Sequence, residues 1–219
     1  DFVSLTGRSE MITLDFLGYW DSRWYAYSEE TALKQIKDYQ QRGYSIDILV
    51  IDTDWRDASS GIGYNINKKL FPNMAKFLAE AHKLGVSIVF NDHPEPAKGT
   101  NSLLDKDEIE YRTKNLTLIL ALGLDYWWYD RNWSVALKGI DSGLSIYCTG
   151  MYAFQWITEQ HYESLVKDPQ DYARRALIMA NVDGILNGDL VYAPELAAHK
   201  YSIQWTGDIG TSAESLKKE

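Results

Sequence analysis

Apolar and polar positions along this chain follow a repeating order of helix and strand. Three segments with helical spacing of their apolar residues end at Gly43, Gly85 and Gly123. Each is followed within a few residues by a short continuous apolar run, namely "IDILVID", "VSIVFND" and "LDYWWYD". Glycine commonly closes a helix because it adopts the left-handed backbone conformation without strain. The pattern therefore predicts successive strand-and-helix units.

The predicted helices have recognisable faces and ends. In the second one Met74, Phe77, Leu78 and Ala81 recur at i, i+3, i+4 and i+7, and Pro72 fits its first turn. The first helix carries an inward stripe of Leu33, Ile36 and Tyr39, with Ser28, Glu29 and Glu30 suiting its N-terminus.

The alternation of strands and helices predicts an α/β fold with a parallel sheet, either doubly wound or closed into a barrel. The apolar runs are continuous, as in strands that are covered on both faces. No glycine-rich phosphate-binding fingerprint follows the first run, which disfavours nucleotide binding. We expect one domain over 1–219, with an irregular excursion over 134–175. Strands are predicted near 12–19, 46–51, 87–91, 125–129, 176–180 and 201–206.

Composition narrows the classes of function. The chain has 219 residues, of which 45% are hydrophobic, enough for one large core. A formal net charge of -9 argues against nucleic acid as the main partner. No apolar run is long enough to cross a membrane, and whether the protein is cytoplasmic or secreted stays open. The single cysteine, Cys148, excludes an internal disulfide and a multi-thiolate metal site.

Carboxylates recur where the predicted strands end. In a parallel barrel the carboxyl ends of all strands face one rim, where active sites are built. One acid after a strand is as often a cap of the next helix, but four strand ends that combine an acid with Trp or Tyr favour a site. The residues concerned are Asp52, Asp54, Asp92 with His93, Asp130 and Asp208.

Most glycoside hydrolases use two carboxyl groups that face each other across the sugar. In the retaining mechanism one attacks the anomeric carbon, while the other protonates the leaving oxygen and then activates water. Eight Trp and 15 Tyr also offer flat faces that suit sugar rings. Spacing alone does not assign a role to any of the acids.

Seven motifs follow one another along nearly the whole chain. They are "LTGR" at 5–8, "LGYWDSRWYAYSEE" at 17–30, "IDILVIDTDW" at 46–55, "LFPNMAKFLAEAHKLGVSIVFNDHPEP" at 70–96, "GLDYWWYDRNW" at 123–133, "MYAF" at 151–154 and "YSIQWTGDIGTSAESL" at 201–216. As a set they resemble the catalytic barrel of glycoside hydrolase family 31, which includes α-glucosidases, α-xylosidases and α-transglucosylases.

The resemblance implies a parallel (β/α)8 TIM-type barrel and a retaining mechanism. Asp130 occupies the nucleophile position in a D-x-N pattern with Asn132, and Asp208 occupies the general acid/base position of W-T-G-D. Asp52 matches the acid that binds sugar hydroxyls in the −1 subsite. An α-linked oligosaccharide or glucoside is the expected partner, with no cofactor and no metal. The other residues expected to line the pocket are Asp54, Trp55, Asp92, His93, Trp127, Asn132 and Trp205.

The chain also departs from the family pattern. Six βα units are predicted where a complete barrel has eight, so a further segment, a second chain or a rebuilt closure is expected to complete it. Because the chain begins at Asp1 rather than Met, we expect a processed product or an excised piece. Trp133, Asn181 and Ala213 replace the family's usual Glu, Arg and Trp.

Two alternatives therefore stay open beside a retaining α-glycosidase or transglycosidase. The first is a catalytically inactive carbohydrate-binding or structural barrel. The second is a different barrel enzyme that holds a metal with Asp52 and Asp54.

Overall fold

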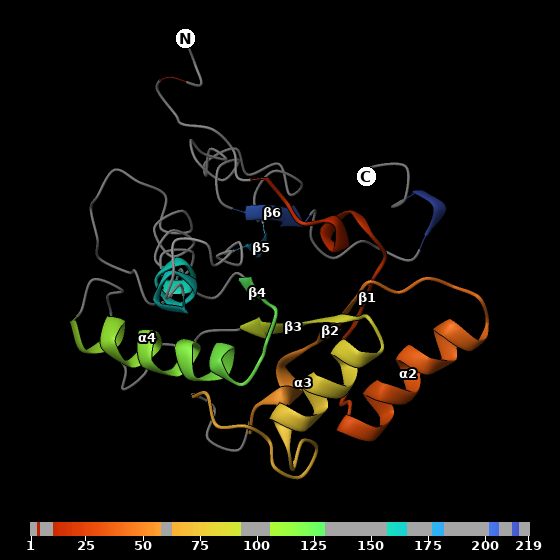
Figure 1. Ribbon diagram of the computed structural model, residues 1–219, viewed down its shortest axis with the longest axis horizontal. Coiled ribbons are helices and arrows are strands. Elements are labelled where there is room, and N and C mark those ends of the chain that lie inside the picture. Colours follow the sequence, from red (N-terminus) through yellow and green to blue (C-terminus); the bar gives the residue numbers. More distant parts are fainter. Residues whose placement is uncertain are drawn as a thin grey trace.

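The described residues of this chain form one sheet of six parallel strands. The computed structural model describes residues 4, 11–57, 63–92, 106–129, 157–165, 177–181, 202–205 and 212–214. The strands are neighbours in chain order, from β1 to β6 (Figure 1). This arrangement confirms the predicted α/β class with a parallel sheet. The strands are β1 (Trp20–Arg23), β2 (Ile48–Ile51), β3 (Ser87–Asp92), β4 (Tyr126–Tyr129), β5 (Ile178–Asn181) and β6 (Ser202–Trp205).

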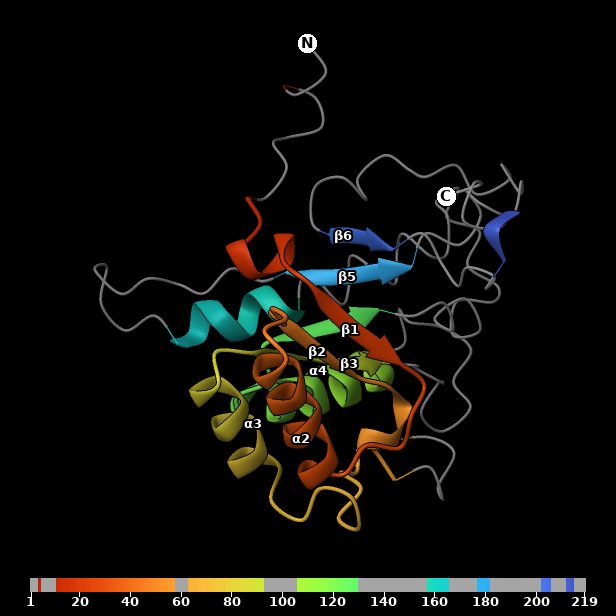
Figure 2. The same ribbon diagram turned by 90° about the vertical axis from the view of Figure 1, so that its right-hand side faces the viewer.

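Helices join the first four strands and cover one face of the sheet. They are α2 (Glu29–Gln41), α3 (Met74–Lys83) and α4 (Lys106–Ala121), with short 3-10 turns η1 (Leu14–Leu17) and η2 (Thr53–Trp55). Figure 1 shows α2, α3 and α4 side by side below β1 to β4. The sheet is curved, since β1 passes in front of β4 and both β5 and β6 lie above them in Figure 2.

Alternate strand residues supply two cores on the two faces of the sheet. The helix-facing cluster combines Leu49, Ile51 and Phe90 with apolar side chains of the three helices. The inner cluster contains Ile48, Val50 and other strand residues that point to the opposite face. All four residues of β2 are fully buried. Both faces are therefore covered, as the continuous apolar runs predict. The inner cluster consists of Phe16, Ile48, Val50, Val89, Tyr126, Trp128 and Leu177.

The predicted helix ends and faces are largely confirmed. Ser28 and Thr31 form a capping box at α2: the Ser28 hydroxyl accepts from the Thr31 N–H (3.1 Å), and the Thr31 hydroxyl accepts from the Ser28 N–H (2.8 Å). Gly43, Gly85 and Gly123 have positive φ angles of 76°, 77° and 107°. The four predicted apolar positions of α3 are all buried.

Two predictions need correction. Asn73 caps α3 by accepting from the Lys76 N–H, so Pro72 lies before the helix rather than in its first turn. The first strand was predicted near 12–19, but η1 occupies Leu14–Leu17 and the strand follows it at Trp20–Arg23. The apolar spacing over 12–17 belongs to a 3-10 turn whose Phe16 packs into the inner cluster. The true strand contains polar residues and carries no apolar run.

The other strand predictions match β2 to β6 to within a few residues at each end. The predicted excursion over 134–175 lies outside the described residues except for 157–165, which are helical. Among the described residues, no helix has both the length and the apolar composition needed to span a bilayer.

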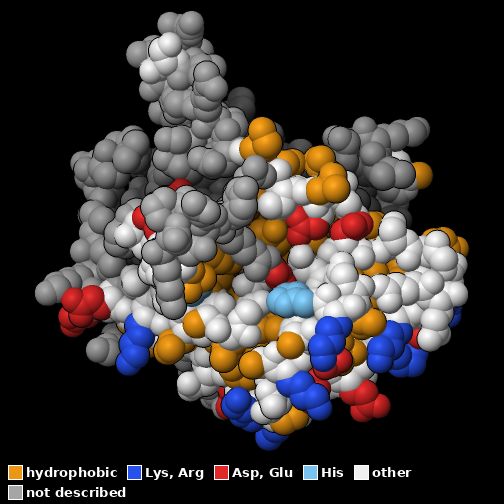
Figure 3. Space-filling view, viewed as in Figure 1, with side chains coloured by type: hydrophobic (Ala, Val, Ile, Leu, Met, Phe, Trp, Pro, Cys, Tyr) orange, Lys and Arg blue, Asp and Glu red, His pale blue; other side chains and the backbone are white. Residues whose placement is uncertain are grey.

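The helix-covered side of the molecule carries charges of both signs. Figure 3, drawn from the same side as Figure 1, shows Lys and Arg side chains interspersed with Asp and Glu over its lower part. Lys83 pairs with Glu80 at 2.7 Å on α3, and Lys34 pairs with Asp38 on α2. Such exposed pairs contribute little to stability.

Candidate active site

The carboxyl ends of the strands gather at one edge of the sheet. The arrowheads of β1, β4, β5 and β6 all point to the right-hand side of Figure 2. The register places Asn91 of β3 level with Trp128 of β4, Trp128 level with Met179 of β5, and Met179 level with Ile203 of β6. Asp52 directly follows the last residue of β2. In a parallel α/β sheet this edge is where ligands bind.

Asp52 is held in place by two short hydrogen bonds. Its Oδ1 accepts from the Asn91 side-chain Nδ2 (2.8 Å) and from the Thr53 N–H (2.7 Å). Thr53 begins η2, so the backbone turns away from β2 immediately after Asp52. Asp52 is only partly buried. A carboxylate with a fixed orientation and some exposure can accept hydroxyl groups of a ligand.

Asn91 is a contact residue of Asp52 that the sequence reasoning missed. It is 2% exposed and lies two positions after Val89 of the inner cluster, so it points to the same face of the sheet. Its backbone carbonyl accepts from the Trp55 Nε1–H at 2.7 Å. The available signal was an amide that interrupts an apolar strand at its carboxyl end.

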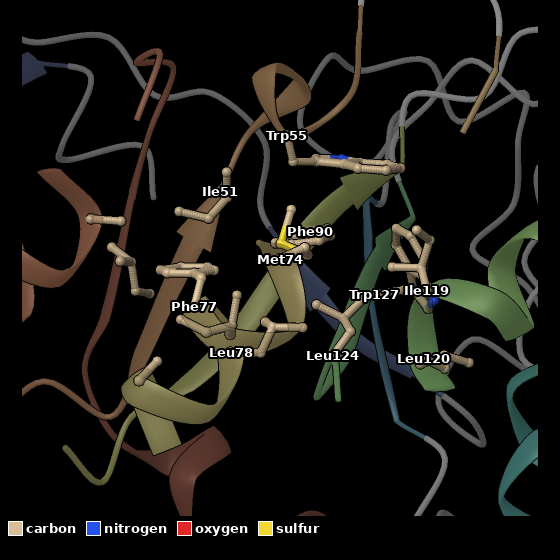
Figure 4. Close-up of a cluster of buried hydrophobic side chains, with 14 of the residues drawn as sticks. Ile51, Trp55, Met74, Phe77, Leu78, Phe90, Ile119, Leu120, Leu124 and Trp127 are labelled. Carbon is tan, nitrogen blue, oxygen red and sulfur yellow. The ribbon is translucent and has the colours of Figure 1, made fainter. Parts of the chain in front are cut away.

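Trp55 and Trp127 lie on the helix-facing side of the sheet and have no exposed surface. Trp55 stacks on Phe90 at 5.1 Å between ring centroids and 10° between planes, and meets Trp127 edge to face at 5.6 Å. Figure 4 shows Trp55 lying across the end of β3. This geometry gives both rings a packing role, and their predicted contact with substrate stays a prediction.

Asp92 ends β3 on the helix-facing side and is 1% exposed. Its Oδ2 accepts from the Tyr64 hydroxyl at 3.1 Å, and that hydroxyl accepts from Nη1 of buried Arg112 on α4 at 3.2 Å. Burial, together with the nearby Asp92 carboxylate, raises the pKa of Tyr64 well above its ordinary value. Tyr64 therefore stays a neutral donor at physiological pH. The three side chains fix the end of β3 to α4.

Asp54 and Trp205 lie at or just beyond the ends of β2 and β6, near the same edge of the sheet. Asp54 lies in η2, where its backbone carbonyl accepts from the Asn67 side chain at 3.3 Å. Trp205 is the last residue of β6. Trp24, the residue after β1, exposes 84% of its surface at the same edge. The residues that fall outside the described part of the chain are His93, Asp130, Asn132 and Asp208.

The described residues contain no group of three or more His, Cys, Asp or Glu side chains placed to hold a metal ion. Asp52 and Asp54 sit two positions apart, and two hydrogen bonds to Asp52 come from an amide and a backbone N–H. The arrangement at Asp52 is that of an oriented hydrogen-bond acceptor.

Comparison with known proteins finds a family model and a curated relative that each match about half of this chain. Residues 9–115 match the family model described as the glycosyl hydrolases family 31 TIM-barrel domain. An α-xylosidase of Saccharolobus solfataricus is 22% identical over 106 residues, which are 48% of this chain and 14% of that protein. The chain thus spans a minor part of the length of this relative.

Solved structures agree with the family match. A xylosidase from Aspergillus niger has a TM-score of 0.67 and 14% identity, over 99% of this chain and 37% of its own. An α-xylosidase of this family from Xanthomonas citri has a TM-score of 0.67 and 16% identity, over 99% and 27%. A cycloalternan-degrading enzyme from Trueperella pyogenes has a TM-score of 0.68 and 12% identity, over 99% and 36%.

At these identities the solved structures show a shared fold, and the family model matches residues 9–115. Both agree with the motifs quoted above. The match over residues 9–115 and the shared fold therefore confirm the resemblance of this chain to the TIM-barrel domain of glycoside hydrolase family 31.

Proposed function

We propose that this chain forms the catalytic-barrel part of a retaining α-glycosidase or α-transglycosidase. Its substrates are α-glucosides, α-xylosides or α-linked oligosaccharides. Relatives described as α-xylosidases and as a cycloalternan-degrading enzyme support this substrate class. Water or a second sugar accepts the glycosyl unit.

The observation that carries the proposal is the fixed carboxylate of Asp52. It lies at the carboxyl edge of a parallel sheet, partly exposed, with Oδ1 held by Asn91 and Thr53. A carboxylate oriented in this way accepts hydroxyl hydrogens of a sugar with a defined geometry. Hydrogen bonds that orient the substrate are a main source of rate in such enzymes, because they hold the reacting atoms in line.

In the proposed reaction Asp130 acts as the nucleophile and Asp208 as the general acid/base. The Asp130 carboxylate attacks the anomeric carbon, the bond from this carbon to the leaving oxygen breaks, and Asp208 gives its proton to that oxygen. Asp208, now ionised, takes a proton from water or from an acceptor hydroxyl. The acceptor oxygen attacks the same carbon and releases Asp130, so that two inversions leave the configuration unchanged.

Two substitutions in the full chain test these roles with α-glucosyl fluoride, α-xylosyl fluoride and sodium azide. Asp130→Ala is expected to abolish turnover, and azide is expected to restore a single displacement that gives the β-glycosyl azide. In Asp208→Ala azide attacks the glycosyl-enzyme intermediate, so the product is the α-glycosyl azide. Nuclear magnetic resonance of the anomeric proton distinguishes the two products.

Wild-type turnover that survives in Asp130→Ala would contradict the role of Asp130. Absence of turnover in the wild-type chain, with sugar binding retained, would favour the inactive carbohydrate-binding barrel. The replacements at Trp133, Asn181 and Ala213 motivate that alternative.

The expectation that a further segment or a second chain completes the barrel remains a proposal. In the described part of the sheet, β1 and β6 each pair with a neighbour on one side. Completing strands would pair with these two edges, since open strand edges readily accept another chain.

A further inference from the structure

The polar contacts at the carboxyl end of β3 converge on Asp52. Asn91 is 2% exposed, and its Nδ2 lies 2.8 Å from Asp52 Oδ1. Since a carboxylate oxygen only accepts, the amide must turn its N–H₂ group toward Asp52. The contact therefore links a buried side chain of β3 to a partly exposed carboxylate that follows β2.

The backbone of Asn91 is held by residues on the helix-facing side of β3. Its backbone carbonyl accepts from Trp55 Nε1 at 2.7 Å, and Trp55 is fixed by stacking on Phe90. The next residue, Asp92, is held by Tyr64 at 3.1 Å. The backbone on both sides of the Asn91 side chain is thus anchored to the helix-facing core, so the amide has little freedom to move.

We propose that Asn91 is a positioning residue that orients the Asp52 carboxylate for sugar binding. The inference rests on the proposed function and adds to it a residue at a position that no motif singled out. A neutral amide is the required chemistry here. It donates a hydrogen bond to Asp52 without adding a charge, so the carboxylate keeps one orientation.

Three charged residues that are described on neighbouring elements have the following positions and contacts. Arg23, at the end of β1, donates to the Tyr27 hydroxyl at 2.8 Å. Asp92 points to the helix-facing side and binds Tyr64. Asp54 belongs to the following turn, η2. An acid introduced at position 91 would act on Asp52 at hydrogen-bond distance, since Asn91 Nδ2 lies 2.8 Å from Asp52 Oδ1.

Three variants of the full chain test the proposal with α-glucosyl fluoride. Asn91→Leu keeps the size of the side chain and removes the donor, so kcat/KM is expected to fall by about tenfold or more. Asn91→Asp places two carboxyl groups together that share a proton, so the acid limb of the pH profile of kcat/KM moves to higher pH. The control Asn115→Leu removes a partly buried amide from α4, where it binds the Tyr111 carbonyl, and is expected to leave both readouts unchanged.

The pH profile separates positioning from stability. A residue needed only for packing would lower activity in Asn91→Leu and Asn91→Asp without displacing the acid limb, and that result would overturn the proposal. Equal kcat/KM in wild type and Asn91→Leu, with urea unfolding confirming that the variant is folded, would also overturn it.

If the wild-type chain turns over neither α-glucosyl fluoride nor α-xylosyl fluoride, calorimetric titration with D-glucose and D-xylose gives an independent readout of sugar binding. That outcome would contradict the proposed function alone. Weaker sugar binding by Asn91→Leu than by Asn115→Leu would then still support the positioning role. Equal binding by the two variants, or no sugar binding by the wild-type chain, would refute it.

Discussion

Single polar side chains inside this core determine where the end of β3 lies. Asp92 and Arg112 are both about 1% exposed, and the Tyr64 hydroxyl bridges them with distances of 3.1 Å and 3.2 Å. A buried charge is tolerated only when partners compensate the loss of water. Loss of the Tyr64 hydroxyl would therefore leave both Asp92 and Arg112 without one of their hydrogen-bond partners in the core.

The substitution Tyr64→Phe tests this view. It removes the hydroxyl and keeps the ring, so Asp92 and Arg112 each lose a hydrogen-bond partner inside the core. We expect the free energy of unfolding to fall by about 1–3 kcal/mol, measured by urea unfolding. Tyr44→Phe is the matched control, since Tyr44 is 65% exposed, and its effect should stay within about 0.5 kcal/mol. Equal effects of the two substitutions would contradict the bridging role.

At this scale the sequence indicates which acids follow the strands and says little about their hydrogen-bond partners. Asp52 was predicted because an acid that ends an apolar strand is visible in the chain. Asn91 was missed, since an amide inside an apolar run was read as part of the strand. Arg112 was also missed, although it shares the buried face of α4 with Leu116, Ile119 and Leu120. An arginine at such spacing signals a buried polar partner across the interface.

Helices were easier to predict than the first strand. The stripe of α3 and the glycine that follows it are local features, and each depends on residues within one or two turns. Strand β1 depends on pairing with β2, in the register that joins Trp20 to Ile48 and Arg23 to Ile51. Its sequence, Trp-Asp-Ser-Arg, has no strand periodicity of its own. The neighbouring strand imposes the extended conformation there.

The end of α3 supplies a prediction about backbone conformation. Gly85 has a φ of +77°, and an added Cβ would meet nothing within 4 Å. Gly85→Ala should therefore destabilise the protein through backbone strain alone, by about 1–2 kcal/mol. Gly85→Asn should cost clearly less, because asparagine tolerates the left-handed conformation better than alanine. Thermal unfolding of both variants checks the order, and an alanine variant as stable as wild type would contradict it.

Stability of the whole molecule should depend on the titration of His161. This residue, in the helix over 157–165, is 6% exposed, and burial lowers its pKa below the ordinary value of 6.5. Below that value the unfolded chain binds a proton that the folded chain does not bind. The free energy of unfolding therefore decreases as the pH falls through this window.

The measurement is urea unfolding of wild type and His161→Gln between about pH 7 and pH 5. Other titrating groups contribute equally to both proteins, so their difference isolates this residue. The loss of stability over this range is expected to be smaller in the variant. An identical loss in both proteins would show that the burial of His161 has no linked effect.

The overall architecture could be predicted because it depends on the order of apolar runs along the chain. Five of the six strands and the three main helices follow from that order. Contacts across the sheet edge, such as Asn91 with Asp52, are 39 positions apart in the chain, and only the strand register brings them together. The roles of Asp130 and Asp208 rest on motifs, and they remain predictions.

The strand order has a consequence for how the protein forms during synthesis. Among the described strands, each one after β1 pairs with the strand made just before it, so none has to wait for a partner that is translated much later. The sheet can grow at one edge as the ribosome releases each new unit, beginning with β1 and β2. At the growing side of the sheet the open edge is always the newest strand, and the next strand to emerge covers it.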